Sequence, residues 1–142
     1  MVITVTECQT EQMRKDAYHV RFTVFVEEQQ VPEEEEIDDL EEEAVHFTAY
    51  DEKTPVGAGR LRLIDKKGKA ERMCVLPSYR KKGVGRQLME WLEQRAKDEG
   101  AEKIVLNAQV QAKPFYQSIN YEVTSGQFLD AGIPHVTMEK QL

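Results

Sequence analysis

The stretch Arg72–Gly100, with the sequence RMCVLPSYRKKGVGRQLMEWLEQRAKDEG, decides the fold of this 142-residue chain. It begins as a strand that ends near Pro77, passes through the basic glycine loop Arg80–Gly85, and continues as a long amphipathic helix capped by Gly100. A helix start presents backbone N–H groups without intrahelical partners, together with the positive end of the helix dipole. Glycines let the backbone approach a bulky anion, and three consecutive cations add charge. The loop therefore predicts a phosphate-binding site.

The segments around this stretch predict a sheet with mixed strand directions. Residues 45–51, 56–65 and 70–76 read as sequential strands with short turns, which is typical of an antiparallel meander. Residues 103–108 are short and mostly apolar, as expected for a strand buried on both faces. Because a helix joins 70–76 to 103–108, these two strands are expected to be parallel neighbours. Further strands are expected at 2–7, 121–125 and 134–140, and further helices at 11–28, around 34–40 and at 113–119.

The predicted fold class is therefore α/β (α+β), with a mixed, mostly antiparallel central sheet and helices on both of its faces. The helix after the loop is expected to direct Val84, Leu88, Trp91 and Leu92 toward the core. A chain of 142 residues is long enough for a single sizeable core, so we expect one domain over residues 1–142.

Composition limits the class of protein. Hydrophobic residues make up 40% of the chain and charged residues 32%, which is typical of a soluble globular protein. No run approaches the roughly 20 apolar residues of a membrane span, and no signal-peptide pattern begins the chain, so no membrane partner is expected. Cys8 and Cys74 form no disulfide framework, which predicts a reducing, cytoplasmic setting. The three histidines have no ligand-like spacing, so no metal is expected.

The net charge of −7 is unevenly distributed. Residues 27–43, called the acidic segment below, contain eleven acidic side chains and no basic one, so the rest of the chain has 15 acids and 19 bases. This segment would repel a polyanion, and we expect no nucleic-acid partner. Most of its side chains are interpreted as a solvated face. The alternative is that a few of them line a pocket for a cationic acceptor.

Two motifs carry a resemblance to a known family. Arg80-x-x-Gly83-x-Gly85 after a strand resembles the Arg/Gln-x-x-Gly-x-Gly/Ala loop of the GNAT superfamily of acyl-CoA-dependent N-acetyltransferases. Asn107-Ala108, Phe115-Tyr116 and Tyr121 resemble the second motif of that family. The segments 21–29 and 132–135 are similar to its small bacterial YjcF-like group, so the resemblance covers nearly the whole chain. The spacing fits neither the Rossmann nor the Walker loop.

The resemblance implies an acetyl-CoA site. Strands 70–76 and 103–108 would splay apart with the thioester in the gap between them. The pantetheine arm would follow the strand backbone like a partial extra strand. The implied cofactor contacts are Met73, Cys74 and Val75 on that strand and Arg80, Lys81, Lys82, Gly83, Val84, Gly85 and Arg86 in the loop, with Asn107 and Phe115 beside them. Two alternatives stay open: Asn107 ties down the following loop, and Phe115 packs in the core.

The resemblance also implies a general acid at Tyr116. When an amine attacks the thioester, the leaving thiolate, with a pKa of about 8.5 as a free thiol, takes a proton from a nearby donor. The family's general acid occupies the position of Tyr116. The alternative is an aromatic ring packed in the core with its hydroxyl satisfied.

The acceptor ammonium must lose a proton before it can attack, and Glu71 is the candidate base, either directly or through a water. The alternative is that Glu71 is a cross-strand partner of Arg60 or Arg62. His46 and His135 are weaker candidates. No base partner is evident for Cys74, so direct transfer is favoured over a thiol nucleophile.

These inferences predict an N-acetyltransferase that transfers the acetyl group of acetyl-CoA to a primary amine of a small molecule or peptide. A homodimer is compatible with the fold. Two other classes stay open: a non-catalytic acyl-CoA-binding or interaction module with the same fold, and a partner-binding protein that acts through its acidic segment.

Overall fold

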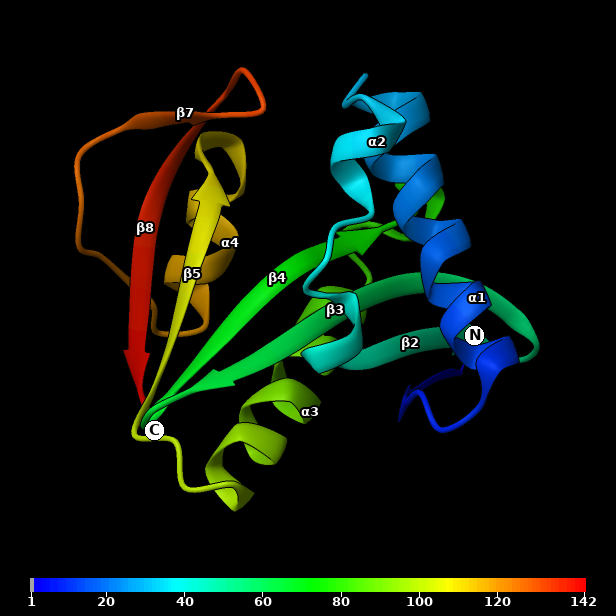
Figure 1. Ribbon diagram of the computed structural model, residues 1–142, viewed down its shortest axis with the longest axis horizontal. Helices are drawn as coiled ribbons and strands as arrows, with labels where there is room; N and C mark the ends of the chain where they lie inside the picture. Colours follow the sequence, from blue (N-terminus) through cyan, green and yellow to red (C-terminus); the bar gives the residue numbers. More distant parts are fainter. Residues whose placement is uncertain (1) are drawn as a thin grey trace.

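The computed structural model describes residues 2–142 and contains one mixed sheet with helices on both faces (Figure 1). The strands follow the order β1-β2-β3-β4-β5-β8-β6, and β7 pairs with β8. Neighbouring strands are antiparallel except for the parallel pair β4 and β5. This confirms the predicted fold class. The strands are β1 (Ile3–Glu7), β2 (Val45–Asp51), β3 (Thr54–Ile64), β4 (Lys67–Val75), β5 (Lys103–Gln109), β6 (Glu122–Val123), β7 (Phe128–Asp130) and β8 (Ile133–Gln141).

The predicted helix over 11–28 is present, but its last seven residues wind as a π-helix. The helix expected around 34–40 is a single turn, because Ile37 leaves the helical region of the backbone. No helix within residues 2–142 is both long enough and apolar enough to cross a membrane. The helical segments are α1 (Glu11–Arg21), η1 (Phe22–Glu28), α2 (Glu33–Glu36), η2 (Glu41–Glu43), η3 (Pro77–Tyr79), α3 (Val84–Asp98), η4 (Val110–Ala112) and α4 (Lys113–Ser118).

Two cores lie on opposite faces of the sheet. The main core joins α3 and α4 to one face and includes the buried Leu88 and Leu92, as the helical spacing predicts. The smaller core joins α1 and η1 to the other face and includes Val20 and Cys74. The prediction that Trp91 faces the core is wrong. Trp91 is 52% exposed, because it lies at the edge of the apolar stripe of α3, about 100° around the helix from Leu92.

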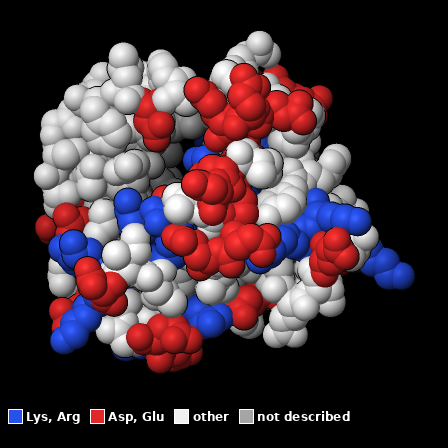
Figure 2. All heavy atoms as spheres, viewed as in Figure 1, with Lys and Arg blue, Asp and Glu red and all other residues white. Residues whose placement is uncertain are grey.

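The acidic segment lies over the α1 face and is fastened there by arginines. The buried Arg21 of α1 pairs with the buried Glu36 at 2.8 Å. Asp38 accepts two hydrogen bonds from the buried Arg60 of β3, at 2.8 and 2.9 Å. Figure 2 shows acidic side chains gathered over α2 and the residues that follow it. The solvated-face interpretation therefore holds for most of the segment but fails for these carboxylates, whose charges are paired with arginines.

Candidate active site

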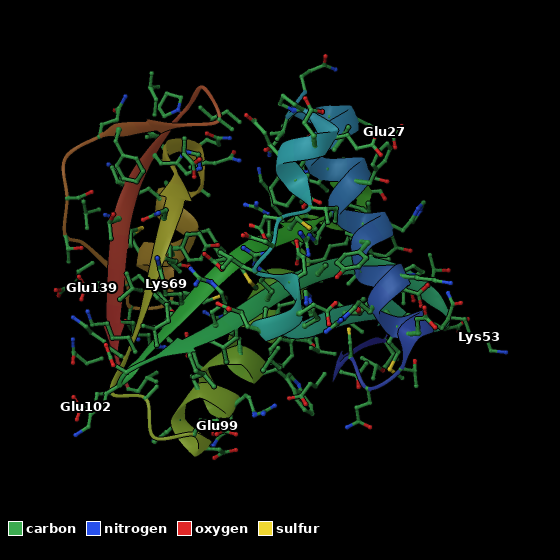
Figure 3. The ribbon with its side chains drawn as sticks, in the orientation of Figure 1. Glu27, Lys53, Lys69, Glu99, Glu102 and Glu139 are labelled. Carbon is green, nitrogen blue, oxygen red and sulfur yellow. The ribbon has the colours of Figure 1, made fainter. Side chains whose placement is uncertain are left out.

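The parallel strands β4 and β5 run together at one end and diverge at the other (Figure 1). Their pairing covers Lys67–Ala70 and Lys103–Leu106, and Figure 3 places Lys69 beside this paired stretch. Beyond it, within residues 2–142, β4 pairs only with β3 and β5 only with β8. A cleft of about 950 Å³ opens where the two strands separate. The cleft therefore has an unpaired strand edge along its wall, which can hydrogen-bond an extended ligand.

A β-bulge on β4 lies just beyond the last residue paired with β5. Arg72 and Met73 together face the single residue Gly59 of β3, and Arg72 has a left-handed φ of 56°. The Met73 thioether occupies the space beside Gly59, so a Cβ at this position would require the Met73 side chain to move. A bulge bends its strand and increases the local twist, so it turns β4 away from β5.

The predicted phosphate loop leads directly into α3. Lys81 and Gly83 both have left-handed backbones, with φ of 62° and 85°. Gly83 is the N-cap of α3; no side chain caps this helix, and its first turn contains no acidic residue. Among residues 2–142, nothing lies within 4 Å of a Cβ built on Gly83. The N–H groups at this helix start are open to an anion, which is the geometry that a phosphate site requires.

The exposed cations of the loop differ in position. Lys81 and Arg86 line the cleft. The Lys82 ammonium lies 5.7 Å from the centre of the Tyr79 ring, and Lys82 is not among the residues that line the cleft. The structure therefore places two of these three predicted contacts, Lys81 and Arg86, at the cleft.

Arg80 is engaged within the protein. Its guanidinium donates two hydrogen bonds to Glu28 of η1, at 2.8 and 2.6 Å, and one to the Val75 carbonyl at 3.0 Å. The ion pair lowers the pKa of the Glu28 carboxyl. The predicted cofactor contacts are the Arg80 amide and the backbone of Val75. In this structure the Arg80 side chain holds the Val75 carbonyl and is itself held by Glu28 of η1.

The strand residues before the loop alternate as expected. Met73 and Val75 pack against the main core, and Cys74 belongs to the smaller core on the other face. Burial raises the pKa of the Cys74 thiol to about 12. A thiol with so little thiolate at neutral pH is a poor nucleophile, which agrees with direct transfer.

Tyr116 of α4 is 8% exposed and packs in the main core, with its ring centre 5.0 Å from Phe115 and 5.7 Å from Tyr121. Ala112 and Phe115 line the cleft, whereas Tyr116 is not among its lining residues. Burial raises the pKa of the Tyr116 hydroxyl, so that it keeps its proton at neutral pH, as a general acid must. The core packing is observed; the role as proton donor stays a prediction.

Glu71 lines the cleft, but arginines occupy both of its carboxylate oxygens. Arg60 donates to Oε1 at 3.1 Å, and Arg62 donates to Oε1 at 2.7 Å and to Oε2 at 3.1 Å. These hydrogen bonds and charges outweigh burial and lower the pKa of the Glu71 carboxyl. A carboxylate held in this way accepts a proton poorly. The geometry therefore favours the alternative interpretation of Glu71 as a cross-strand partner of two arginines.

Asn107 and Phe115 both line the cleft. The side-chain oxygen Oδ1 of Asn107 accepts a hydrogen bond from the Thr137 hydroxyl at 2.9 Å. This bond ties β5 to β8 and not to the loop that follows β5. Phe115 is 36% exposed, and its ring would lie 3.2 Å from a Cβ on Gly85. A glycine at position 85 thus lets the Phe115 ring close against the start of α3.

Three side chains of the cleft were given no leading role by the sequence reasoning. The side-chain amide of Gln109 on β5 donates a hydrogen bond to the side-chain oxygen Oε1 of Gln29 at 2.7 Å, which links β5 to the end of η1 across the gap. His135 of β8 is buried and lines the same cleft. The sequence contained only a weak indication that these residues belong to the site. Gln29 and His135 both lie in the segments that resemble the YjcF-like group, but a short motif does not by itself assign a role to a residue.

A family model described as an acetyltransferase (GNAT) domain matches residues 5–142. The chain belongs to the GNAT family. An uncharacterized N-acetyltransferase of Bacillus subtilis, YjcF, is 55% identical over 133 residues, which cover 93% of this chain and 95% of that protein. The family resemblance read from the loop and from the second motif is thereby confirmed, and the chain is an acyltransferase enzyme.

Solved structures of GNAT proteins share the fold. A putative N-acetyltransferase from Lactobacillus plantarum superposes with a TM-score of 0.91 at 29% identity, covering 100% of this chain and 99% of that one. A Bacillus subtilis acetyltransferase solved in complex with CoA gives a TM-score of 0.74 at 17% identity, with 99% of each chain covered. The overall fold is therefore common to these chains.

Proposed function

We propose that this GNAT enzyme transfers the acetyl group of acetyl-CoA directly to a primary amine of a small molecule or peptide. The observation that carries the proposal is the separation of β4 and β5 beside an open, uncapped helix start. An anionic group at the start of α3, an extended arm along the free edge of β4 and a thioester between the strands fit one continuous cleft.

The residues present fit this donor. The start of α3 has no side-chain cap, and Gly83, Val84 and Gly85 line the cleft, where Lys81 and Arg86 add positive charge. Backbone groups of Met73 and Cys74 lie on the unpaired side of the gap. The Val75 carbonyl contributes only if Arg80 releases it.

The proposed reaction uses the Tyr116 hydroxyl as its proton donor. The amine nitrogen attacks the carbonyl carbon of the thioester, the C–N bond forms and the C–S bond breaks. The sulfur leaves with the bonding electron pair and takes the proton of the Tyr116 hydroxyl, and the proton that the nitrogen releases returns through water to the Tyr116 oxygen. Because the Cys74 thiol is buried with a raised pKa, the acetyl group passes to the amine without an acyl-cysteine stage.

Both cysteines support an assignment to a reducing compartment. Cys8 and Cys74 are free thiols, and Cys8 contacts the Thr48 hydroxyl at 3.0 Å instead of another sulfur. We assign the enzyme to the cytoplasm on this ground.

The proposal is tested by incubating the protein with acetyl-CoA and a panel of primary amines. Thiol release is followed, and the acceptor mass is measured for the added acetyl group. Acetylation of at least one amine supports the proposal. Tight binding of CoA without acetylation of any amine would favour the non-catalytic module instead.

A further inference from the structure

A second, smaller cavity of about 190 Å³ adjoins the cleft on the α2 side of the sheet. Both spaces are lined by Phe25, Gln29, Arg72, Gln109, Asp130 and His135, so they lie next to each other. Figure 2 shows this face hollowed between the β7–β8 side and the acidic side chains over α2. Its volume is below the range of roughly 300–1,000 Å³ that is typical of ligand pockets, so it suits a short, unbranched molecule.

His135 is the buried polar side chain shared by the two spaces. It is 8% exposed and stacks on Phe128, with ring centres 6.0 Å apart. Its Nδ1 lies 2.6 Å from the Ile133 carbonyl oxygen, which can only accept, so Nδ1 carries the proton and donates it. In a neutral imidazole Nε2 then keeps a free lone pair, and within residues 2–142 this atom has no hydrogen-bond partner.

His135 lies on β8, next to β5 and on the side away from β4, and its side chain lines the cleft. It pairs with Gln109 of β5, and Asn107, two residues before Gln109, lies on the same face and lines the cleft. Glu71 also lines the cleft, but both of its oxygens are held by arginines. Among these side chains, the His135 imidazole combines a free lone pair with a fixed ring orientation.

Negative charge remains around the small cavity after the charged side chains that pair with each other have been set aside. Arg72 donates to the backbone carbonyls of Glu35 and Glu36 and to the Asp38 carboxylate, and the Glu36 carboxylate pairs with Arg21. The carboxylates of Glu35 on α2 and Asp130 on β7 have no ion-pair partner within residues 2–142. An acceptor in this cavity therefore meets two free negative charges from opposite walls.

We infer that the small cavity binds a short aliphatic amine carrying a second positive charge, and that His135 accepts the proton of the reacting amine. This rests on the proposed acetyl transfer. The ammonium proton moves to His135 Nε2, the freed lone pair forms the C–N bond, and the C–S bond breaks. The sulfur takes the Tyr116 proton. Once the C–N bond has formed, the nitrogen releases its second proton, which passes through water to the Tyr116 oxygen. The imidazolium gives its own proton to water, so that both side chains are restored.

Three acceptors of matched length test the charge preference: 1,4-diaminobutane, 1-aminobutane and 4-aminobutanoate. The diamine is expected to have the highest kcat/KM and the amino acid the lowest. Replacing both carboxylates, Glu35→Gln with Asp130→Asn, should raise KM for the diamine by about fivefold and should raise KM for 1-aminobutane by a smaller factor. Glu33→Gln, an exposed acid on the same helix that does not line the cavity, is the control.

His135→Asn tests the base. The asparagine amide can keep the donor at the Nδ1 position toward Ile133 while removing the Nε2 lone pair. We expect kcat/KM for the diamine to fall by about a hundredfold with unchanged affinity for CoA. If His135 takes the proton, kcat/KM of the wild type should decline on the acid side of its pH profile, and this acidic limb should be absent from the variant. The charged groups that line the small cavity with the imidazole are Glu35, Glu36, Arg72 and Asp130, and the double carboxylate variant is measured over the same pH range as a comparison.

The outcomes separate this inference from the proposed function. If 1-aminobutane or 4-aminobutanoate is acetylated as well as the diamine, or if His135→Asn retains full activity and the acidic limb, the inference is overturned and acetyl transfer stands. If CoA binds but no amine is acetylated, both are overturned. Should His135→Asn fail to fold, the wild-type pH profile and the carboxylate variants still decide.

Discussion

The Glu28 carboxylate of η1 holds the Arg80 guanidinium of the phosphate loop in a two-point ion pair, with N–O distances of 2.8 and 2.6 Å. Both side chains line the cleft. The pair joins a π-helical segment on one face of the sheet to the loop that opens the helix on the other face. Arg80 therefore reaches a bound phosphate only by giving up Glu28.

Removing this competition should strengthen donor binding. In Glu28→Gln the amide loses the negative charge, so Arg80 is free to turn toward a phosphate and one repelling carboxylate is gone. Calorimetry should show a Kd for CoA that is lower by about threefold, in line with one exposed ion pair. Glu27→Gln, at the outward position labelled in Figure 3, should leave the Kd unchanged. Weaker binding in Glu28→Gln would mean that the ion pair positions the loop instead.

Substitutions at two glycines with nearly the same left-handed backbone can distinguish an effect on stability from an effect on CoA binding. Gly83 and Gly100 lie at opposite ends of α3 with φ of 85° and 87°, and a Cβ on either meets nothing within 4 Å among residues 2–142. Each Gly→Val change should lower the free energy of unfolding by about 1–2 kcal/mol, because an L-residue resists a left-handed backbone. Only Gly83→Val should also raise the Kd for CoA, by at least about tenfold, since its side chain fills the open space at the helix start. Equal Kd values for the two variants would remove the loop from the binding site.

Tyr116→Phe should lower kcat by at least about tenfold and leave the Kd for CoA nearly intact, because the hydroxyl acts only as the C–S bond breaks. Burial raises the pKa of Tyr116, so the wild-type rate should not decline on the alkaline side until above pH 10. Tyr121→Phe is the matched control. Its hydroxyl donates to Glu93 at 2.8 Å, and its loss should reduce stability by about 1 kcal/mol without changing kcat. Steady-state rates that match in wild type and Tyr116→Phe would exclude the proposed acid.

The acidic segment should make the fold sensitive to acid. Arg60 lowers the pKa of the Asp38 carboxyl to about 2, from a usual value of 3.8. The stability that this carboxylate contributes is therefore complete above about pH 4 and is lost as the pH falls toward 2. Asp38→Asn should cost about 2 kcal/mol of unfolding free energy at pH 7 and should flatten this acid-dependent loss. Denaturant titrations from pH 7 to pH 2 measure both effects. The exposed Asp39, which makes no ion pair within residues 2–142, gives the control Asp39→Asn, whose stability should follow the wild type.

Local sequence was sufficient for the elements that depend on local chemistry. The loop 80–85 lies between a strand and a helix, so its backbone geometry follows from neighbouring residues, and the crossover rule then made β4 and β5 parallel. For Glu71 the sequence offered two roles, a base or a cross-strand partner of Arg60 or Arg62, and could not choose between them, since only the folded sheet defines the register that sets both arginines against Glu71. The bulge at Arg72 was missed because nothing in an arginine suggests a left-handed backbone.

The acidic segment also shows that local sequence does not reveal which charged side chains pair in the folded protein. Its composition reads as a solvated face, yet Glu36 and Asp38 find arginines 15 and 22 residues away in sequence. Charge counting cannot tell a paired carboxylate from a free one. For the same reason charge counting could not show that Glu35 and Asp130, which line the small cavity with His135, have no ion-pair partner within residues 2–142.

The cleft and the small cavity place opposite charges on opposite sides of the sheet, with the cationic loop before α3 and the free carboxylates on α2 and β7. This charge separation should attract the two substrates to different places: the anionic donor to the cationic loop and the cationic acceptor to the free carboxylates. Acetylation then removes a positive charge from the nitrogen, which weakens its hold on the cavity and favours departure of the product over re-entry.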